Sequence, residues 1–237
     1  MKTLSTLFIA TAFLFQSCGN GIEKTTTEVE AETEIIDKQM EVADTNNIKI
    51  PNGYAELMKS PASGKVMGRL LFDFDNDSEN DIATIVQHQS EFSAYKLLIF
   101  LTTSKKQYEV DLYSTNGFSV YPVPLETSGN MLEFGYFEDG TAAFGRFLKL
   151  RYNAKLEKIQ VIGYDCGYRA SPSEHVDKSY NLLTGKYIVK RTSYEESDKG
   201  KTVEFSGKNE YFKNNVFIED LNLEMIINLD DVGSKYE

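Results

Sequence analysis

The chain has 237 residues, a formal net charge of −11 at pH 7 and an aromatic content of 12%. The acidic balance and the lack of a basic patch exclude nucleic acid and anionic lipid headgroups as charge-matched partners. The 15 Phe and 14 Tyr residues supply enough apolar surface for one sizeable hydrophobic core in a chain of this length.

The first 17 residues have the pattern of a secretory signal peptide. Lys2 supplies the positive start, and the apolar run Leu7–Phe15 follows it. This run is too short to cross a bilayer as a helix, which takes about 20 residues. Ser17, Cys18 and Gly19 then resemble the lipobox of bacterial lipoproteins. That resemblance implies that Cys18 is lipidated and becomes the new N-terminus. The alternative is an ordinary signal that is cleaved beside an unmodified cysteine.

A lipidated Cys18 predicts a protein that is anchored to a membrane surface of the bacterial cell envelope. The residue after it is Gly19 and not aspartate, which by resemblance implies the outer membrane, on its periplasmic or its surface face. Cys166 is then the one cysteine left, so no internal disulfide is expected. The folded domain must therefore be held together by its core.

Residues 18–47 differ in composition from everything that follows. They contain eight acidic residues, two lysines and no aromatic residue, which amounts to a net charge of −6. Such a segment buries little apolar surface and repels itself, so we expect a flexible tether between the anchor and the domain. The apolar residues of Glu28–Val42 are loosely spaced as in a helix, and a transient helix is the alternative there.

Residues 48–237 are expected to form one folded domain, with a pattern that is mostly that of β-strands. Tyr54–Lys59 is the exception, a candidate short helix that ends before Pro61. The apolar run Leu97–Leu101 predicts a central strand that is buried on both faces. The strands are expected, in chain order, at Val66–Phe72, Ile82–Val86, Tyr95–Leu101, Tyr108–Tyr113, Phe118–Val123, Met131–Phe137, Thr141–Tyr152, Leu156–Tyr164, Tyr187–Tyr194, Thr202–Phe205 and Asn215–Ile218.

Turn residues between these strands indicate how they connect. Asn116 and Gly117 predict a hairpin, and Pro122 and Pro124 place the strand after it at a sheet edge, because proline cannot donate to a ladder. No alternation of strands with long amphipathic helices occurs. The expected fold is therefore mainly β: a single antiparallel or mixed β domain, either a sandwich or a strongly twisted sheet, with few short helices.

The most informative segment is the acidic loop that begins after Phe72. Its acidic residues occupy every second position, at Asp73, Asp75, Asp77, Glu79 and Asp81. Alternate side chains of a tightly curled loop can point inward together, and Ca²⁺ takes about six to eight oxygen ligands. The loop is not an EF-hand, because strands flank it and because Ser78 and Thr84 occupy the positions of the required Gly and Glu.

The spacing resembles the calcium hairpin of the FG-GAP/VCBS type, which occurs in integrin-like propeller blades and in secreted bacterial proteins. The resemblance covers Asp73–Val86, and Asn76 and Ser78 stand where that family has glycine. Those two positions are expected to need a positive φ. The resemblance implies Ca²⁺ as the bound cofactor, with a backbone carbonyl and four side chains as ligands: Glu79 by its carbonyl, and Asp73, Asp75, Asp77 and Asp81 by their carboxylates.

Two interpretations of the loop stay open. A calcium site of the extracellular kind, with a Kd of roughly 10⁻⁴–10⁻³ M, stabilises the folded state by about 0.4–1.4 kcal/mol at millimolar calcium. The alternative is a water-facing turn, since Asp and Asn favour turns without any metal. Crowded carboxylates repel one another, which favours the cation. The acidic pattern occurs once, so a propeller built from repeats of it is not expected.

A second, looser resemblance extends over the later strands. The segments concerned are Phe147–Tyr152, Ile159–Gly163 and Tyr180–Lys186. Together with the acidic hairpin they look like a group of small exported bacterial proteins of unassigned function. This resemblance implies a single β-rich domain and no established activity.

Candidate catalytic residues are few. Cys166 and His175 lie nine positions apart in a polar stretch, and a Cys–His pair would need the imidazole near the sulfur. The alternative is that Cys166 ends a strand and packs as a small apolar residue. His88 is a candidate to join the loop acids in a transition-metal site, but a surface histidine is the favoured interpretation. No serine-hydrolase, zinc-protease or phosphate-loop motif occurs.

Two functions follow, and the first is favoured. One is a non-catalytic lipoprotein of the cell envelope that binds or scaffolds a protein or a glycan, in which case Tyr95, Tyr113 and Tyr121 are candidates for an exposed aromatic cluster. The other is an envelope hydrolase with an unrecognised carboxylate or Cys–His site. A deep pocket with convergent acids, or Cys166 close to His175, distinguishes the second from the first.

Overall fold

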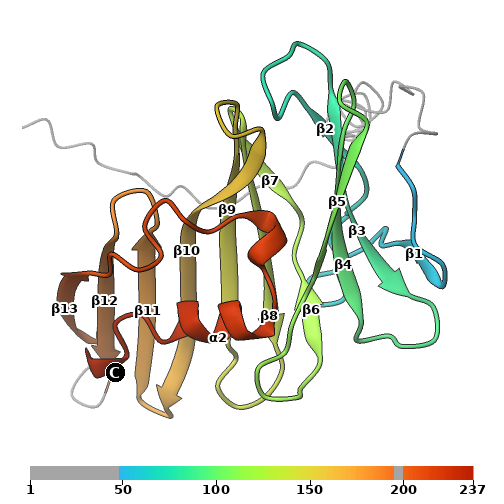
Figure 1. Cartoon of the computed structure of the whole chain (residues 1–237). Helices are drawn as coiled ribbons and strands as arrows, with labels where there is room; N and C mark the ends of the chain where they lie inside the picture. Colours follow the sequence, from blue (N-terminus) through green and yellow to red (C-terminus); the bar gives the residue numbers. More distant parts are fainter. Residues whose placement is uncertain (1–47, 195–199, 237) are drawn as a thin grey trace, which may run out of the picture. The chain divides into compact units, whose positions relative to one another are not determined.

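Two antiparallel sheets and one α-helix make up the computed structural model, which describes residues 48–194 and 200–236 (Figure 1). The expected signal peptide, Cys18 and the expected tether at 18–47 lie outside the described residues. Every strand pair is antiparallel, so the prediction of a mainly β domain with few short helices is confirmed. None of the helices in the described residues is long and apolar enough to span a membrane.

The smaller sheet has the order β1-β3-β4-β5, with β2 also paired to β3. Its strands are β1 (Tyr54–Glu56), β2 (Leu70–Phe72), β3 (Asp81–His88), β4 (Tyr95–Leu101) and β5 (Lys106–Asp111). Strand β4 has the expected bounds and lies between β3 and β5. Leu97 and Ile99 pack into the main core, whereas Leu98 and Phe100 pack with Ile48 on the other side. The prediction of a central strand buried on both faces is therefore confirmed.

The larger sheet has the order β13-β12-β11-β10-β9-β8-β6, with β7 also paired to β8. Its strands are β6 (Val120–Pro122), β7 (Glu126–Ser128), β8 (Met131–Glu138), β9 (Gly145–Asn153), β10 (Lys158–Ser171), β11 (Glu174–Asn181), β12 (Lys186–Ser193) and β13 (Lys201–Lys208). Strand β6 ends the order, so the edge position predicted from Pro122 and Pro124 is confirmed.

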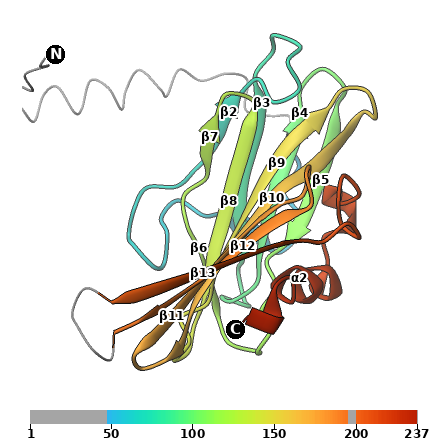
Figure 2. The ribbon, with the colours of Figure 1, turned by 90° about the vertical axis from the view of Figure 1, so that its left-hand side faces the viewer.

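One face of the larger sheet carries the main core. It packs against the smaller sheet and against α2 (Leu223–Asp230), which crosses the sheet between the turns η1 (Ile218–Asp220) and η2 (Ser234–Tyr236). Figures 1 and 2 show α2 on this side of the sheet. Ile226 and Leu229 of α2 join the same cluster as Leu148 of β9 and Ile85 of β3. We call this the inner face of the larger sheet and the opposite one the outer face.

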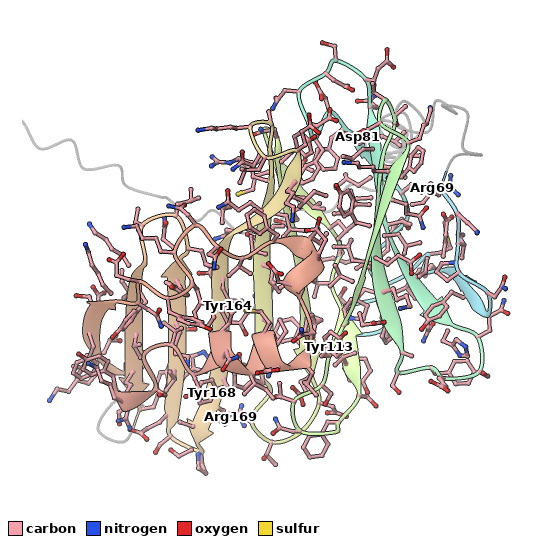
Figure 3. The ribbon with its side chains drawn as sticks, viewed as in Figure 1. Arg69, Asp81, Tyr113, Tyr164, Tyr168 and Arg169 are labelled. Carbon is pink, nitrogen blue, oxygen red and sulfur yellow. The ribbon has the colours of Figure 1, made fainter. Side chains whose placement is uncertain are left out.

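A buried arginine fastens α2 to the inner face. The guanidinium of Arg146, on β9, lies 2.7 Å from Glu138 of β8 and 2.9 Å from Asp230 of α2, and its side chain is fully buried. Tyr164 donates a hydrogen bond to the same Asp230 carboxylate and lies beside α2 in Figure 3. Glu138 also accepts the backbone N–H of Asn116. The charges are buried only because they are paired.

Three expected elements are wrong. Tyr54–Lys59 is not a helix, because its first residues pair with β3 at Tyr54↔His88. Asn116 and Gly117 do not close a hairpin, since β5 and β6 belong to different sheets. The loop between these strands is held by Glu138, which accepts a hydrogen bond from the backbone N–H of Asn116. Asn215–Ile218 contributes one isolated bridge, Gln160↔Phe217, and leads into η1. In each of these segments, contacts with residues far away in the chain set the local structure, and local propensity did not predict it.

Candidate metal centre

The acidic loop closes the hairpin between β2 and β3. Its ends are paired at Phe72↔Asp81, so the residues between them have to curl back over a short distance. Phe74 points into the main core, is fully buried and packs edge-to-face on Phe72 at 5.3 Å between ring centroids. Since neighbouring residues of an extended segment point to opposite sides, anchoring Phe74 turns Asp73 and Asp75 away from the core.

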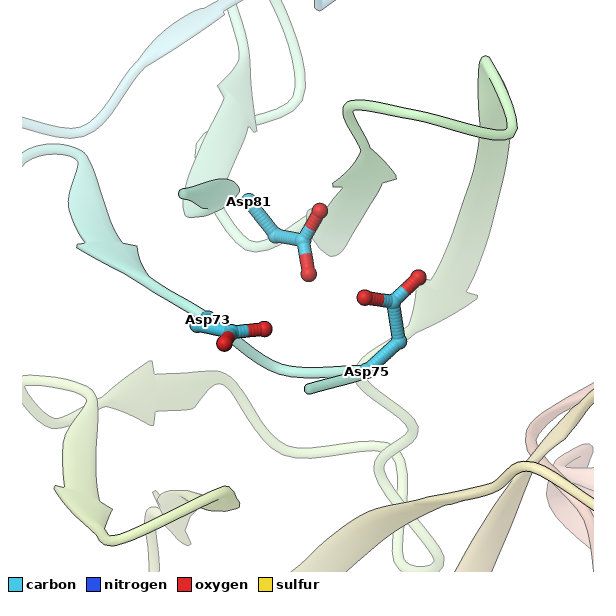
Figure 4. Close-up of side chains that lie close together, drawn as sticks. All are labelled: Asp73, Asp75 and Asp81. Atoms are coloured by element: carbon cyan, nitrogen blue, oxygen red, sulfur yellow. The ribbon is translucent and has the colours of Figure 1, made fainter. Parts of the chain in front are cut away.

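Three of the five predicted acidic residues come together. One carboxylate oxygen each of Asp73, Asp75 and Asp81 lies within 4.8 Å of the other two, and Figure 4 shows the three side chains pointing toward one another. Ca²⁺ binds oxygen at about 2.3–2.6 Å, so two oxygens on opposite sides of one ion are about 5 Å apart. The group could therefore hold a metal ion.

Two of these carboxylates are positioned by backbone N–H groups. Asp81 is fully buried, and its two oxygens accept from Phe74 at 3.0 Å and from Thr102 at 2.7 Å. Asp73 accepts from Asp77 at 3.0 Å and from Ser78 at 3.1 Å. Carboxylate oxygens have further lone pairs, so these contacts orient both groups and still leave capacity for a ligand.

One oxygen of the Asp75 carboxylate has no such N–H donor. This atom, Oδ1, is buried, with no hydrogen-bond partner among the described residues. Burial, and then the negative charges of Asp81, Asp77 and Asp73, raise the pKa of this carboxyl to about 6. A buried and unpartnered carboxylate oxygen is costly, and a cation bound beside it removes that cost. The chemistry of this donor set, oxygen atoms alone, fits a hard cation.

The other two predicted ligands are not part of this three-oxygen group. Asp77 and Glu79 are exposed, and Asp77 Oδ1 accepts the N–H of Glu79 at 2.9 Å. The hydroxyl of Thr103 and this N–H lower the pKa of Asp77. Ligation by the Asp77 carboxylate and by the Glu79 carbonyl stays a prediction.

The backbone has the conformation that the glycine positions of the resembled hairpin suggested. Asn76 has φ of 62° and Ser78 has φ of 74°. Both are therefore in the left-handed region, which Asn tolerates better than other residues with a Cβ. The curled loop therefore contains backbone strain, and most of this strain lies at Ser78.

The sequence did not reveal which other segments meet the loop. Thr102, just after β4, donates its N–H to Asp81 and its hydroxyl to the carbonyl of Asn80 at 2.6 Å. Tyr152 of β9 is close enough that burial and then the charge of Asp75 raise the pKa of its phenol. The three-carboxylate group therefore lies where a turn of the smaller sheet meets a strand of the larger one, a tertiary contact without a signal in local spacing.

The candidate catalytic residues do not meet. Cys166 is buried in the main core, whereas His175 is half-buried and lies 3.1 Å from Asp177. The strand register pairs Cys166 with Lys178 and Arg169 with His175, which puts Cys166 and His175 on opposite faces of the sheet. His88 packs edge-to-face on Tyr54 at 4.9 Å, away from the three carboxylates. Tyr95, a candidate for an exposed aromatic cluster, is buried.

Comparison with known proteins yields no relative: no protein-family model, curated protein or solved structure matches this chain.

Proposed function

We propose that this chain is a non-catalytic binding or scaffolding module of the bacterial cell envelope, and that Ca²⁺ bound by Asp73, Asp75 and Asp81 stiffens its β domain. The observation that carries the calcium site is the buried Oδ1 atom of Asp75, which has no hydrogen-bond partner among the described residues. One oxygen of the Asp75 carboxylate lies within 4.8 Å of an oxygen of Asp73 and of Asp81, and a cation compensates all three charges.

Calcium suits this loop better than magnesium. Mg²⁺ demands near-ideal octahedral geometry and keeps several waters, whereas Ca²⁺ accepts irregular sets of carboxylate and carbonyl oxygens. Asp73 and Asp81 are already held by backbone N–H groups, so their oxygens cannot rearrange freely around a small ion. Additional oxygens are available from Asp77, from the Glu79 carbonyl and from water, in agreement with the FG-GAP/VCBS resemblance.

The expected role of the ion is mechanical. It would tie Asp73 and Asp75 of the loop to Asp81 of β3, and Asp81 in turn holds the turn after β4 through Thr102. A stabilisation of about 0.4–1.4 kcal/mol at millimolar calcium is enough to hold a hairpin in one conformation. Backbone N–H groups of the loop and of the turn after β4 hold Asp73 and Asp81 in place, which favours a structural role.

The alternative, an envelope hydrolase, is no longer supported by a Cys–His pair. A Cys–His nucleophile requires the sulfur and the imidazole to be within hydrogen-bond reach. Cys166 and His175 lie on opposite faces of the larger sheet. Anchoring by lipid at Cys18 and location at the outer membrane are part of the proposal, and they rest on the lipobox resemblance. Incorporation of labelled palmitate, and its loss in Cys18→Ala, tests the anchor.

Isothermal titration of the calcium-free chain with CaCl₂ tests the metal site directly. We expect one saturable site with a Kd of roughly 10⁻⁴–10⁻³ M, weakened about tenfold or more in Asp75→Asn. Glu126→Gln, which makes the same carboxylate-to-amide change at an exposed position of β7, is the matched control and should bind as the unaltered chain does. The absence of saturable heat, or equal binding by Asp75→Asn, would contradict the proposal.

A further inference from the structure

We infer that a groove across the outer face of the larger sheet is the binding site of this module, and that its ligand is an uncharged glycan. The inference rests on the proposed function in one respect, that the domain binds rather than catalyses. It does not depend on calcium, because the groove and the acidic loop share no residue.

The groove has a volume of about 510 Å³ and crosses five strands, from β8 to β12. Pockets that bind small molecules usually have about 300–1,000 Å³, an apolar floor and a few polar groups. In the described residues, α2 and its neighbouring turns pack on the inner face, as Figure 2 shows, and no described helix lies over the groove. Neighbouring strands are about 4.8 Å apart, so a path across five of them is roughly 19 Å long. That length suits an extended chain of several sugar rings.

Two cross-strand rows of residues form the groove. The strand registers align them from β8 to β12, and each row mixes aromatic, small and polar residues: Phe137, Gly145, Gly167, Asp177 and Lys190 in the first row, and Gly135, Phe147, Asp165, Ser179 and Ile188 in the second. All of these except Gly135 line the groove. The hollow therefore follows from the register of the sheet, not from a loop.

Glycines create the depth of the groove. A Cβ atom at Gly145 would come within 2.7 Å of the Phe137 ring, and one at Gly135 within 2.3 Å of the Phe147 ring. The two rings therefore lie against glycine on the neighbouring strand, edge-to-face at 5.8 Å between centroids. Gly167 comes next in the first row, and the ends of the Asp177 and His175 side chains lie over it. Phe137 keeps 38% of its surface exposed, as a ledge for an apolar ligand face.

The far side of the groove is polar, and its ionisable groups already have partners. Asp165 forms an ion pair with Lys149 at 2.6 Å and Lys190 forms one with Glu204 at 3.4 Å, while Asp177 lies within hydrogen-bond distance of His175 at 3.1 Å. A charged ligand would compete for these groups with their present partners. Hydroxyl groups can use the remaining lone pairs and N–H groups without doing so, because a hydroxyl both donates and accepts.

An uncharged sugar chain matches both sides of the groove. A pyranose ring has an apolar face of C–H bonds, which packs on an aromatic ring, and hydroxyls at its edge, which form hydrogen bonds with carboxylates and imidazole. The rings of Phe137 and Phe147 lie on one side, and Asp165, Asp177 and His175 on the other. An apolar peptide would leave the second side unused, and a charged polymer would compete with the existing ion pairs.

Native affinity electrophoresis of the full chain tests this inference. The gels contain one of four soluble polymers: mixed-linkage β-glucan, xyloglucan, galactomannan, or polygalacturonate as the charged counterpart. We expect at least one of the three neutral polymers to retard the chain, with or without EDTA, and polygalacturonate to leave its migration unchanged. Retardation by none of the neutral polymers, or by polygalacturonate alone, overturns the inference.

Two groove variants and one control assign the binding to this surface. Phe137→Ala removes the ledge, and Gly167→Val fills the hollow where only the ends of Asp177 and His175 have to move. Each should weaken retardation about tenfold or more in apparent Kd. Phe92→Ala, at an aromatic residue that is 72% exposed outside the groove, should not. Melting temperatures show that each variant is folded. Retardation of a folded Gly167→Val variant at the unaltered strength refutes the site, whereas loss of calcium binding refutes only the metal proposal.

Discussion

Replacing Asp75 by asparagine should have opposite effects on stability with and without calcium. In the calcium-free chain the change removes a negative charge that burial and three neighbouring aspartates disfavour. It should therefore stabilise the folded state at pH 7. In the presence of calcium the same change removes a ligand, so the variant should gain nothing from the ion.

The magnitude follows from the pKa of Asp75, which is about 6 instead of the ordinary 3.8. Converted in full, this difference corresponds to about 3 kcal/mol of unfavourable interaction at pH 7. The side chain is only half-buried, and screening by water reduces the figure to about 1 kcal/mol. For a domain of this size that raises the melting temperature by about 2–4 °C. Calcium at 1 mM should raise that of the unaltered chain by about 1–6 °C.

The pH dependence identifies the cause. Asp75 holds its proton more tightly in the folded state, so its contribution to stability is present below pH 3.8 and is lost as the pH rises through 6. In EDTA, the stabilisation by Asp75→Asn should therefore be small at pH 4 and complete at pH 7. Melting curves by circular dichroism at both pH values, in EDTA and in CaCl₂, measure all four states.

Two outcomes of these melting curves would contradict an unsatisfied Asp75 carboxylate that binds calcium. If Asp75→Asn melts below the unaltered chain in EDTA at pH 7, the carboxylate makes favourable contacts and is not an unsatisfied group. If both proteins gain equally from calcium, the ion binds elsewhere. Glu126→Gln controls for the loss of one negative charge, because Glu126 is exposed on β7.

Three further outcomes follow from the same structure. Asp77→Asn should keep at least half of the calcium-induced rise in melting temperature, because this exposed carboxylate lies outside the three-oxygen group; complete loss of the rise would make Asp77 an essential ligand. Ser78→Gly should stabilise the chain by about 0.5 kcal/mol in urea unfolding, with or without calcium, because Ser78 has φ of 74°; a loss of stability would mean that the Ser78 side chain makes compensating contacts. Arg146→Ala should cost about 3–5 kcal/mol in the same assay, since it leaves Glu138 buried without its ion pair, and Arg146→Lys should not restore the loss because one ammonium cannot replace the guanidinium fork. A cost below about 1 kcal/mol would show that water reaches this cluster.

Local pattern was sufficient for the parts of the fold in which neighbouring residues set the structure. The apolar run in β4 predicted a strand buried on both faces, and the alternating Asp residues with Asn76 and Ser78 predicted a curled acidic loop with positive φ. Other elements escaped detection. Strand β11 has polar residues at six of its eight positions, and Lys178 occupies an inward position, so the alternation of apolar and polar residues is broken. Helix α2 has only eight residues, too few for a clear helical period.

Residue pattern alone indicates that this chain is β-rich and that it has a loop of alternating acids able to gather around a cation. The three-dimensional arrangement selects Asp73, Asp75 and Asp81 as the residues that converge and leaves Asp77 exposed. It also decided that Cys166 and His175 face opposite sides of a sheet, and that Phe137 and Gly167 fall into one row. The reason is physical: alternation along a strand is local, whereas register and sheet packing are set by contacts between residues far apart in the chain.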